Sequence, residues 1–247
     1  MYALRERLKY WLFHVVISAL LCTAIAFAVY QRWYPQEMAD LLGVSVIFAI
    51  LAIASLLIWP LLTALVIKTD KKEQRRDHRI LWCIQIVFTV ITIYFLVSSR
   101  IMWAVYSVDS FEIIRAQDVL YSEKIALNPE FKVGILDNFK WLGASFSHDA
   151  ELEKIQRNED VNGISIARRV DALVPLEQKK ALLQKHARPI ETLREFNDET
   201  KVKGIQKQFP QATIWLPIKG FTRDAVVLTN ADFSSFNIVM LVPWEED

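Results

Sequence analysis

The chain has 247 residues, of which 53% are hydrophobic, and it carries 29 Lys and Arg against 28 Asp and Glu. The charges are unevenly placed: residues 1–100 hold 11 basic and 6 acidic side chains, whereas residues 101–247 hold 18 and 22. A mildly acidic C-terminal part lacks the basic face that nucleic-acid binding requires, so no nucleic acid is expected as a partner. The two cysteines, Cys22 and Cys83, are too few for a disulfide framework or a cysteine–histidine zinc site.

Three long apolar runs, residues 11–30, 43–67 and 80–99, contain no Asp, Glu, Lys or Arg. A helix needs about 20 apolar residues to cross the hydrocarbon core of a bilayer. A helix of a soluble protein is seldom apolar on every side over such a length. The sequence therefore predicts a three-helix transmembrane domain over residues 1–100, in preference to a soluble helical core. The first run also resembles a signal peptide, but its length and the aromatic residues that follow favour an uncleaved anchor.

The basic residues between these runs predict which side of the membrane each segment occupies. Residues 1–10 hold three basic and one acidic side chain, and the loop 68–79 holds six and three. The connection 31–42 holds one basic and two acidic side chains. Because Lys and Arg collect on the cytoplasmic side, the N-terminus and the loop 68–79 are expected there. The connection and residues 101–247 are then expected outside, which is the periplasm in a Gram-negative bacterium.

Polar and small residues recur at helical spacing inside all three runs. Those of the second run form a track of small side chains at Ser45, Ala49, Ala52 and Ser55. Such faces let membrane helices approach closely and form hydrogen bonds in lipid. They serve either to pack the three helices together or to bind another membrane helix. On the second interpretation the candidate partner-binding residues come from the first and third runs: His14, Ser18, Cys22, Gln85, Thr89 and Thr92.

Residues 101–247 have the pattern of a periplasmic α+β domain with a small antiparallel sheet. Residues 131–147 are aromatic-rich and irregular, with Gly134 and Gly143 as breakers. Helical periodicity covers residues 176–186, and a further turn or two is expected after Pro189. Alternating apolar residues and turn signals predict strands at 102–108, bent near 109–110 and continuing to 114, and at 212–219, 225–229 and 236–242, the last two joined as a hairpin.

Catalytic signatures are missing from this sequence. Residues 148–153 are rich in His, Asp and Glu but lack the i, i+4 histidine pair of a zincin, so they are interpreted as an acidic helix start. Residues 143–147 resemble a nucleophile elbow whose closing glycine is replaced by Ser147. The six glycines form no phosphate-binding loop. We therefore expect no enzyme activity, no cofactor and no metal site.

Four short motifs, in this order and spacing, resemble the TfpX/TfpZ family of type IV pilin accessory proteins, which includes proteins called FimB. They are Trp33-Tyr34-Pro35, Pro60-Leu61-Leu62-Thr63, the stretch Trp103–Phe111, and Pro243-Trp244. The resemblance covers nearly the whole chain. It implies an inner-membrane accessory protein, or chaperone, that binds its cognate major type IV pilin through transmembrane and periplasmic surfaces. It also implies contact with the bilayer and with other inner-membrane components of pilus assembly.

The resemblance suggests a specific contact for His14, and one alternative function remains open beside it. A pilin awaiting assembly has an apolar helix with an acidic residue near its start, and His14 lies at the correct depth to pair with that carboxylate. The alternative function is a membrane-anchored sensor or assembly regulator whose periplasmic domain binds a small ligand or an envelope component. The 12-residue basic loop at 68–79 is too short to be a cytoplasmic output domain, which counts against the alternative.

Overall fold

The computed structural model describes residues 2–34, 37–58, 61–62, 71–123 and 125–244 of the chain. The chain divides into two compact units. Unit 1 comprises Met1–Gln31 and Val44–Ser98, and unit 2 comprises Arg32–Gly43 and Ser99–Asp247. The connection between the first two apolar runs thus groups with the C-terminal part of the chain. Each unit is described by itself.

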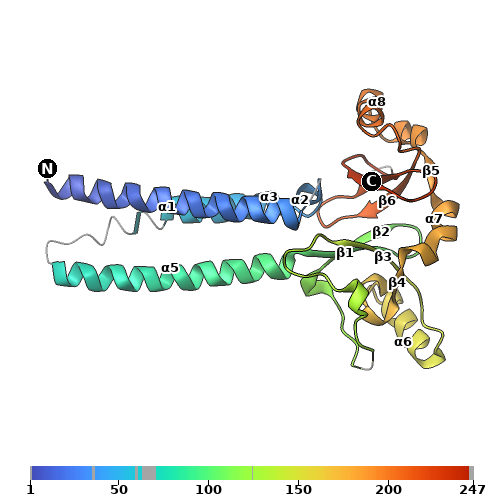
Figure 1. Cartoon of the computed structure of the whole chain (residues 1–247), viewed down its shortest axis with the longest axis horizontal. Helices are drawn as coiled ribbons and strands as arrows, with labels where there is room; N and C mark the ends of the chain where they lie inside the picture. Colours follow the sequence, from blue (N-terminus) through green and yellow to red (C-terminus); the bar gives the residue numbers. More distant parts are fainter. Residues whose placement is uncertain (1, 35–36, 59–60, 63–70, 124, 245–247) are drawn as a thin grey trace. The chain divides into compact units, whose positions relative to one another are not determined.

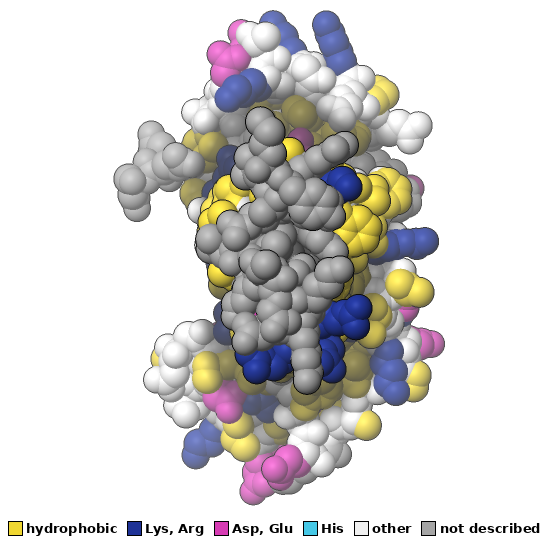
Figure 2. Space-filling view, turned by 90° about the vertical axis from the view of Figure 1, so that its left-hand side faces the viewer, with side chains coloured by type: hydrophobic (Ala, Val, Ile, Leu, Met, Phe, Trp, Pro, Cys, Tyr) yellow, Lys and Arg dark blue, Asp and Glu magenta, His cyan; other side chains and the backbone are white. Residues whose placement is uncertain are grey.

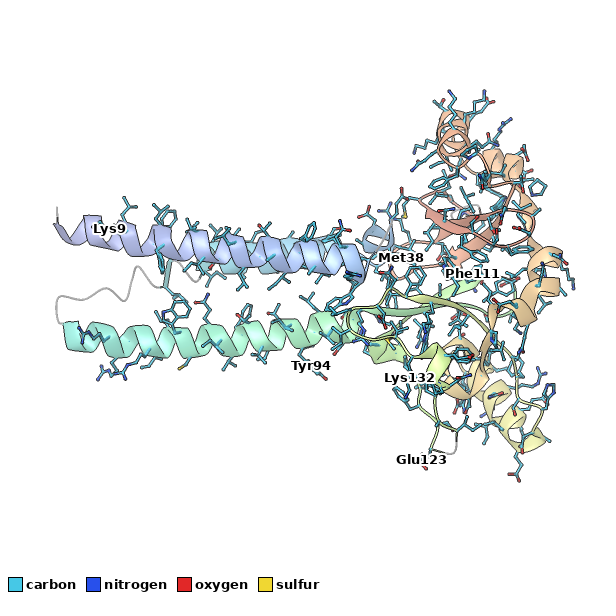
Figure 3. The ribbon with its side chains drawn as sticks, viewed as in Figure 1. Lys9, Met38, Tyr94, Phe111, Glu123 and Lys132 are labelled. Carbon is cyan, nitrogen blue, oxygen red and sulfur yellow. The ribbon has the colours of Figure 1, made fainter. Side chains whose placement is uncertain are left out.

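Unit 1 is built from long helices (Figure 1). They are α1 (Tyr2–Arg32), α3 (Val44–Ile53), which continues as the π-helix η1 (Ala54–Ile58), and α5 (Lys71–Ser99). Among the described residues, two stretches are long and apolar enough to cross a membrane, Trp11–Arg32 and Arg75–Ser99. Only 12% and 6% of these stretches are buried within the protein, so their apolar side chains are largely uncovered. Tyr94, for example, points away from α5 and is 67% exposed (Figure 3).

The structure therefore agrees with part of the prediction of three membrane spans. Two helices have the required length and composition. Of the second run, residues 44–58 and 61–62 are helical and its remaining positions lie largely outside the described residues, so a third spanning helix stays a prediction. The prediction of a loop at 68–79 is wrong from Lys71 onward, because α5 begins at that residue. Lys, Arg, Glu and Gln favour helix, and no Gly or Pro interrupts this stretch, which explains the early start.

Unit 2 contains a mixed sheet rather than the small antiparallel sheet that the sequence predicted. Its described residues form eight strands in the order β4-β3-β1-β2-β6-β7-β8, with β5 paired to β6. The pairs β1/β3 and β2/β6 are parallel, and the other pairs are antiparallel. The strands are β1 (Ile101–Tyr106), β2 (Phe111–Arg115), β3 (Lys140–Ala144), β4 (Leu173–Pro175), β5 (Arg188–Pro189), β6 (Ile214–Lys219), β7 (Ala225–Thr229) and β8 (Phe236–Val239).

Two strand predictions need correction. The strand expected to bend near residues 109–110 is a hairpin of β1 and β2, closed where Ser107 N donates to Ser110 O at 3.2 Å. The stretch 131–147 is not irregular throughout, because it contains β3. Gly143 lies within β3, where a Cβ atom would meet Cγ of Lys179 at 2.6 Å. This glycine thus permits close packing inside a strand instead of breaking it. The predicted hairpin of β7 and β8 is confirmed.

The helices of unit 2 are short, and two of them, α6 and α8, have N-termini capped by acidic side chains. The Asp149 carboxylate accepts hydrogen bonds from backbone amides at the start of α6, and the Asp198 carboxylate does the same for α8. Helix α8 was not predicted from the sequence. The helix expected to end at His186 is confirmed as α7. Helices α6 and α8 lie at opposite ends of unit 2, with α7 between them (Figure 1). The α-helices are α6 (Ala150–Val161), α7 (Lys180–His186) and α8 (Glu199–Gln208); the 3-10 turns are η2 (Ala116–Asp118), η3 (Pro129–Phe131), η4 (Ile166–Arg168), η5 (Val170–Ala172), η6 (Leu176–Lys179) and η7 (Ile190–Glu195).

Two hydrophobic clusters stabilise unit 2, and each contains a buried tryptophan. Trp103 of β1 belongs to a cluster with β3, β4 and residues near 166–173. Trp215 of β6 belongs to a second cluster with β7, β8, η7 and α8. Both indoles are satisfied: Trp103 Nε1 donates to Phe131 O at 2.8 Å, and Trp215 Nε1 donates to Thr192 Oγ1 at 2.9 Å. A buried Trp needs such a partner, so directional hydrogen bonding as well as apolar contact fixes each cluster.

The connection that follows α1 is an integral part of unit 2. It contains the short helix α2 (Met38–Leu41), whose Met38 and Leu41 are fully buried (Figure 3). Tyr34 Oη donates to Ser99 O at 3.0 Å, which ties the end of α1 to the last residue of α5. Thr222 N donates to Leu41 O at 3.2 Å. Residues 32–43 and the sheet must therefore lie on the same side of any membrane that the chain crosses.

Candidate functional site

A cavity of about 330 Å³ lies between the helices of unit 1. This volume is at the lower end of the range for sites that hold small ligands or several buried side chains. Its wall is predominantly apolar, with a few hydroxyl, thiol and amide groups. The residues that line it, from α1, α3 and α5 in turn, are Ser18, Leu21, Cys22, Ile25, Ala26, Tyr30, Ser45, Phe48, Ala49, Ala52, Gln85, Phe88, Thr89, Thr92, Ile93 and Leu96.

Five of the six candidate residues meet at this cavity. Ser18 and Cys22 come from α1, and Gln85, Thr89 and Thr92 come from α5. Residues three or four apart share one face of a helix, which is why the spacing read from the sequence brings them together. His14, the sixth, occupies the position one turn before Ser18 in α1, but its side chain lies outside the described part of the structure. Whether this cavity binds a partner stays a prediction.

The Ser18 hydroxyl is the most unusual polar group of the cavity. Its side chain is only 3% exposed, and Oγ has no hydrogen-bond partner among the described residues. Leaving a buried hydroxyl unpaired costs roughly 1–3 kcal/mol. Thr89, on the opposite wall, is different, because its Oγ1 donates to Gln85 O at 2.8 Å within α5. Ser18 therefore gives the wall a fully buried hydrogen-bond donor that no described residue uses.

Aromatic and small side chains shape the rest of the wall. Tyr30 Oη donates to Ser45 Oγ at 3.2 Å, which joins α1 to α3. The Tyr30 and Phe48 rings lie 5.3 Å apart at 46°. Ala26 and Ala49 contribute only a methyl group each, and this lack of bulk leaves space between the helices. Small residues on a helix face permit the close approach of another helix or of a large side chain.

None of the described residues that line this cavity is an Asp, Glu, Lys, Arg or His. Within the part of the chain that the structure describes, no three His, Cys, Asp or Glu side chains gather to hold a metal ion. Cys83 is exposed and lies off the cavity. An apolar wall with a buried, unused donor at Ser18 suits an apolar group that brings a hydrogen-bond acceptor.

Contacts within unit 2 involve both stretches that the sequence analysis considered for catalysis, residues 148–153 and 143–147. The Asp149 carboxylate caps α6 by accepting from Glu151 N and Leu152 N, both at 3.0 Å, as the acidic-helix-start interpretation predicted. Ser145 N donates to Ala172 O at 2.8 Å, extending the pairing of β3 rather than forming a strand-to-helix elbow.

A cluster of charged side chains, separate from the cavity, lies in unit 2. Arg169 donates two bonds to Asp171, Nε to Oδ1 at 2.9 Å and Nη2 to Oδ2 at 2.8 Å, and it also pairs with Glu159. Gln156 Nε2 donates to Asp171 Oδ1 at 3.1 Å. Burial raises the pKa of Asp171, but the bonds from Arg169 and Gln156 outweigh it and hold that pKa below its usual value. Both oxygens of the Asp171 carboxylate have a protein partner, so this carboxylate has a structural role.

Two groups of residues escaped the sequence reasoning. The apolar lining residues, such as Leu21, Ile25 and Phe88, share the helical spacing of the polar stripes, and extending the stripes to all residue types would have found them. The docked connection was also missed. Its signal was the apolar character of Met38, Leu41 and Leu42 in a segment too short to be a domain.

One curated relative resembles the chain over most of its length. The chain is 24% identical over 179 residues to "Fimbrial assembly protein, serogroup E1" of Dichelobacter nodosus, which covers 72% of this chain and 70% of that protein. No family model matches the chain. No solved structure matches it either.

Proposed function

We propose that the protein is a membrane accessory factor of type IV pilus assembly that holds the cognate major pilin before the pilin enters the fibre. The observation that carries this proposal is the similarity to a fimbrial assembly protein over about 70% of each chain. Apolar helices alone can resemble one another by composition. An alignment of 179 residues exceeds the hundred that contain the apolar runs, so the similarity extends into unit 2.

In this proposal the chain crosses the inner membrane three times. Helices α1 and α5 supply two crossings. Their ends at Arg32 and Ser99 lie on one side, because the residues that follow α1 pack within unit 2 together with Ser99. The start of α5 then lies on the opposite side from Gly43, so residues 44–70 carry the chain back across the bilayer. This requirement supports the second span independently of its hydropathy.

The basic residues set the direction of these crossings. Lys and Arg outnumber Asp and Glu in residues 1–10 and in 68–79. These segments are cytoplasmic by the positive-inside rule. Unit 2 is then periplasmic, on the side where a pilin keeps its globular head. A protein of this design can contact the membrane helix and the head of one pilin together.

The unit 1 cavity is the proposed site for the pilin helix. Its volume accepts apolar side chains of a neighbouring helix, and Ser18 offers a donor to an acceptor carried by that helix. Satisfying this hydroxyl would recover part of the penalty for its burial, which favours the occupied state. His14, one turn nearer the proposed cytoplasmic side, is the candidate for pairing with the pilin carboxylate.

The first experiment is deletion of the gene in its own bacterium, with pilin quantified by immunoblot and surface pili counted by electron microscopy. We expect fewer pili, less pilin, or both, and restoration by the wild-type gene on a plasmid. Unchanged pilin and pilus numbers would remove the basis of the proposal.

The second experiment compares two identical substitutions two residues apart on α1. Ala26 lines the cavity, whereas Ala28 is exposed and lies off it. Ala26→Leu should reduce the recovery of pilin with the tagged accessory protein, because the added carbons occupy the cavity, while Ala28→Leu should leave recovery unchanged. His14→Ala and Ser18→Leu test the polar contacts in the same assay. Equal recovery with all four variants would eliminate the cavity as the docking site.

A further inference from the structure

Unit 2 carries an exposed apolar turn at residues 133–137. Ile135 is 54% exposed and Leu136 is 75% exposed. The turn has a defined shape, because Gly134 N donates to Asp137 Oδ2 at 2.8 Å. These two adjacent side chains acquire significance together with the other apolar groups near them, because larger exposed apolar patches mark interaction sites.

Two hydrogen bonds place this turn beside the points where α1 and α5 enter unit 2. Trp33 Nε1 donates to Ile135 O at 2.6 Å, and Trp33 directly follows the last residue of α1. Arg100 Nη2 donates to Val133 O at 3.1 Å, and Arg100 directly follows the last residue of α5. The apolar turn is therefore held within a few side-chain lengths of both helix ends.

A second exposed apolar group lies at the corresponding place near α3. Phe221 is 51% exposed, and its amide donates to Leu41 O at 3.1 Å, only three residues before α3 begins. The Arg115 guanidinium lies 3.5 Å from the centre of the Phe221 ring. Two loops far apart in sequence thus bring apolar side chains next to residues that adjoin the helices of unit 1, the turn beside α1 and α5 and Phe221 near the start of α3.

Basic and aromatic groups accompany these side chains. Lys132 is exposed beside the turn (Figure 3), and Arg100, Arg115 and the Trp33 indole lie near the same helix ends. Figure 2 shows hydrophobic side chains and Lys or Arg side chains in the same view of the molecule. Trp, basic residues and exposed aliphatic groups together are typical of a surface at the headgroup level of a bilayer.

We propose that the turn 133–137 and Phe221 insert into the headgroup region of the outer leaflet and so fix unit 2 against the lipid surface. The partner is the bilayer itself, because hydrogen bonds hold both loops beside residues that directly follow or closely precede the proposed membrane helices. This inference rests on the membrane-crossing part of the proposed function. The competing assignment is that the same loops contact pilin. An experiment without pilin distinguishes lipid contact from pilin contact.

The test uses the purified full chain in lipid nanodiscs without pilin, with Cys22→Ala and Cys83→Ala as background. An environment-sensitive fluorophore is attached to Leu136→Cys or Phe221→Cys. Val108→Cys is the matched control, because Val108 is 60% exposed but lies beyond the far end of β1, roughly 20 Å along the strand from Arg100. Val90→Cys, also 60% exposed and within α5, reports whether the helices are inserted.

We expect the probes at Leu136 and Phe221 to emit at shorter wavelength than the probe at Val108. They should be quenched by headgroup-linked nitroxide lipids and protected from aqueous iodide. The inference would be overturned if emission and iodide quenching at Leu136 equalled those at Val108. Quenching at Val90 by deep nitroxides would then show that the membrane crossing itself still holds. Absence of deep quenching at Val90 would instead overturn the crossing, and with it both proposals.

Discussion

At the residue scale, the pair Arg169–Asp171 makes unit 2 sensitive to a single change. The Arg169 side chain is 13% exposed and the Asp171 side chain only 1%. Arg169→Leu would leave a buried carboxylate without its cation, which costs about 3–5 kcal/mol. We expect the urea midpoint of the full chain in detergent, followed by tryptophan fluorescence, to fall markedly. Lys203→Leu is the control, because Lys203 pairs with Glu199 on the surface and such pairs contribute under about 1 kcal/mol. Equal losses in both variants would show that the buried pair has no special weight.

The same pair predicts how stability responds to acid. The folded-state pKa of Asp171 lies below its unfolded value, because hydrogen bonds from Arg169 and Gln156 outweigh the opposing effect of burial. A carboxyl of this kind stabilises the fold fully above its unfolded pKa of about 4, and the contribution is lost as pH falls through the lower folded value. The thermal midpoint should thus decline below about pH 4. In Asp171→Asn the midpoint should be lower near neutrality and decline less steeply in acid. Parallel pH profiles for the two proteins would exclude Asp171 as the responsible group.

At the element scale, the packing of α2 on the 220–224 turn predicts a contrast between two glycines. A Cβ at Gly220 would meet Leu41 O at 2.9 Å and the carbonyl oxygen of Arg223, both backbone atoms that cannot rotate away. Gly204, in α8, has open space at the same position. Gly220→Ala should cost about 1–3 kcal/mol through overpacking. Gly204→Ala should instead stabilise by roughly 0.5–1 kcal/mol through helix propensity. The check is the urea midpoint of each variant, and a neutral Gly220→Ala would mean that the turn and α2 separate easily.

The elements of unit 2 also show which sequence signals were sufficient. Strands β6, β7 and β8 were found because alternation and a turn at 230–232 are local signals. Strand β3 was missed because Gly143 resembles a strand breaker in the sequence. The reason for a glycine here is the close approach of the Lys179 side chain, which is distant in sequence and leaves no local pattern. The parallel pairs β1/β3 and β2/β6 were missed for the same reason, since their partners are far apart in the chain.

At the scale of the whole molecule, the candidate site was more accessible to sequence reasoning than the fold. Helical spacing brought Ser18, Cys22 and Thr89 to one cavity because a straight helix keeps its register over many turns. The burial of Ser18 without a partner could not be foreseen, because it depends on the neighbouring helices. The grouping of residues 32–43 with unit 2 also required tertiary contacts, such as the bond from Met240 N to Glu37 Oε2 at 2.5 Å.

That grouping makes the number of membrane crossings testable with three cysteines in a background of Cys22→Ala and Cys83→Ala. Asp40 and Val161 belong to unit 2, and Gln74 lies near the start of α5. In spheroplasts, a membrane-impermeant maleimide should label Asp40→Cys and Val161→Cys, and it should label Gln74→Cys only after permeabilisation. Sidedness of this kind requires the chain to cross between residues 43 and 71 and again along α5. If Gln74→Cys reacted as readily as Asp40→Cys in intact spheroplasts, residues 44–70 would not cross. Helix α5 would then connect two points on one side, and its uncovered apolar surface would need another explanation.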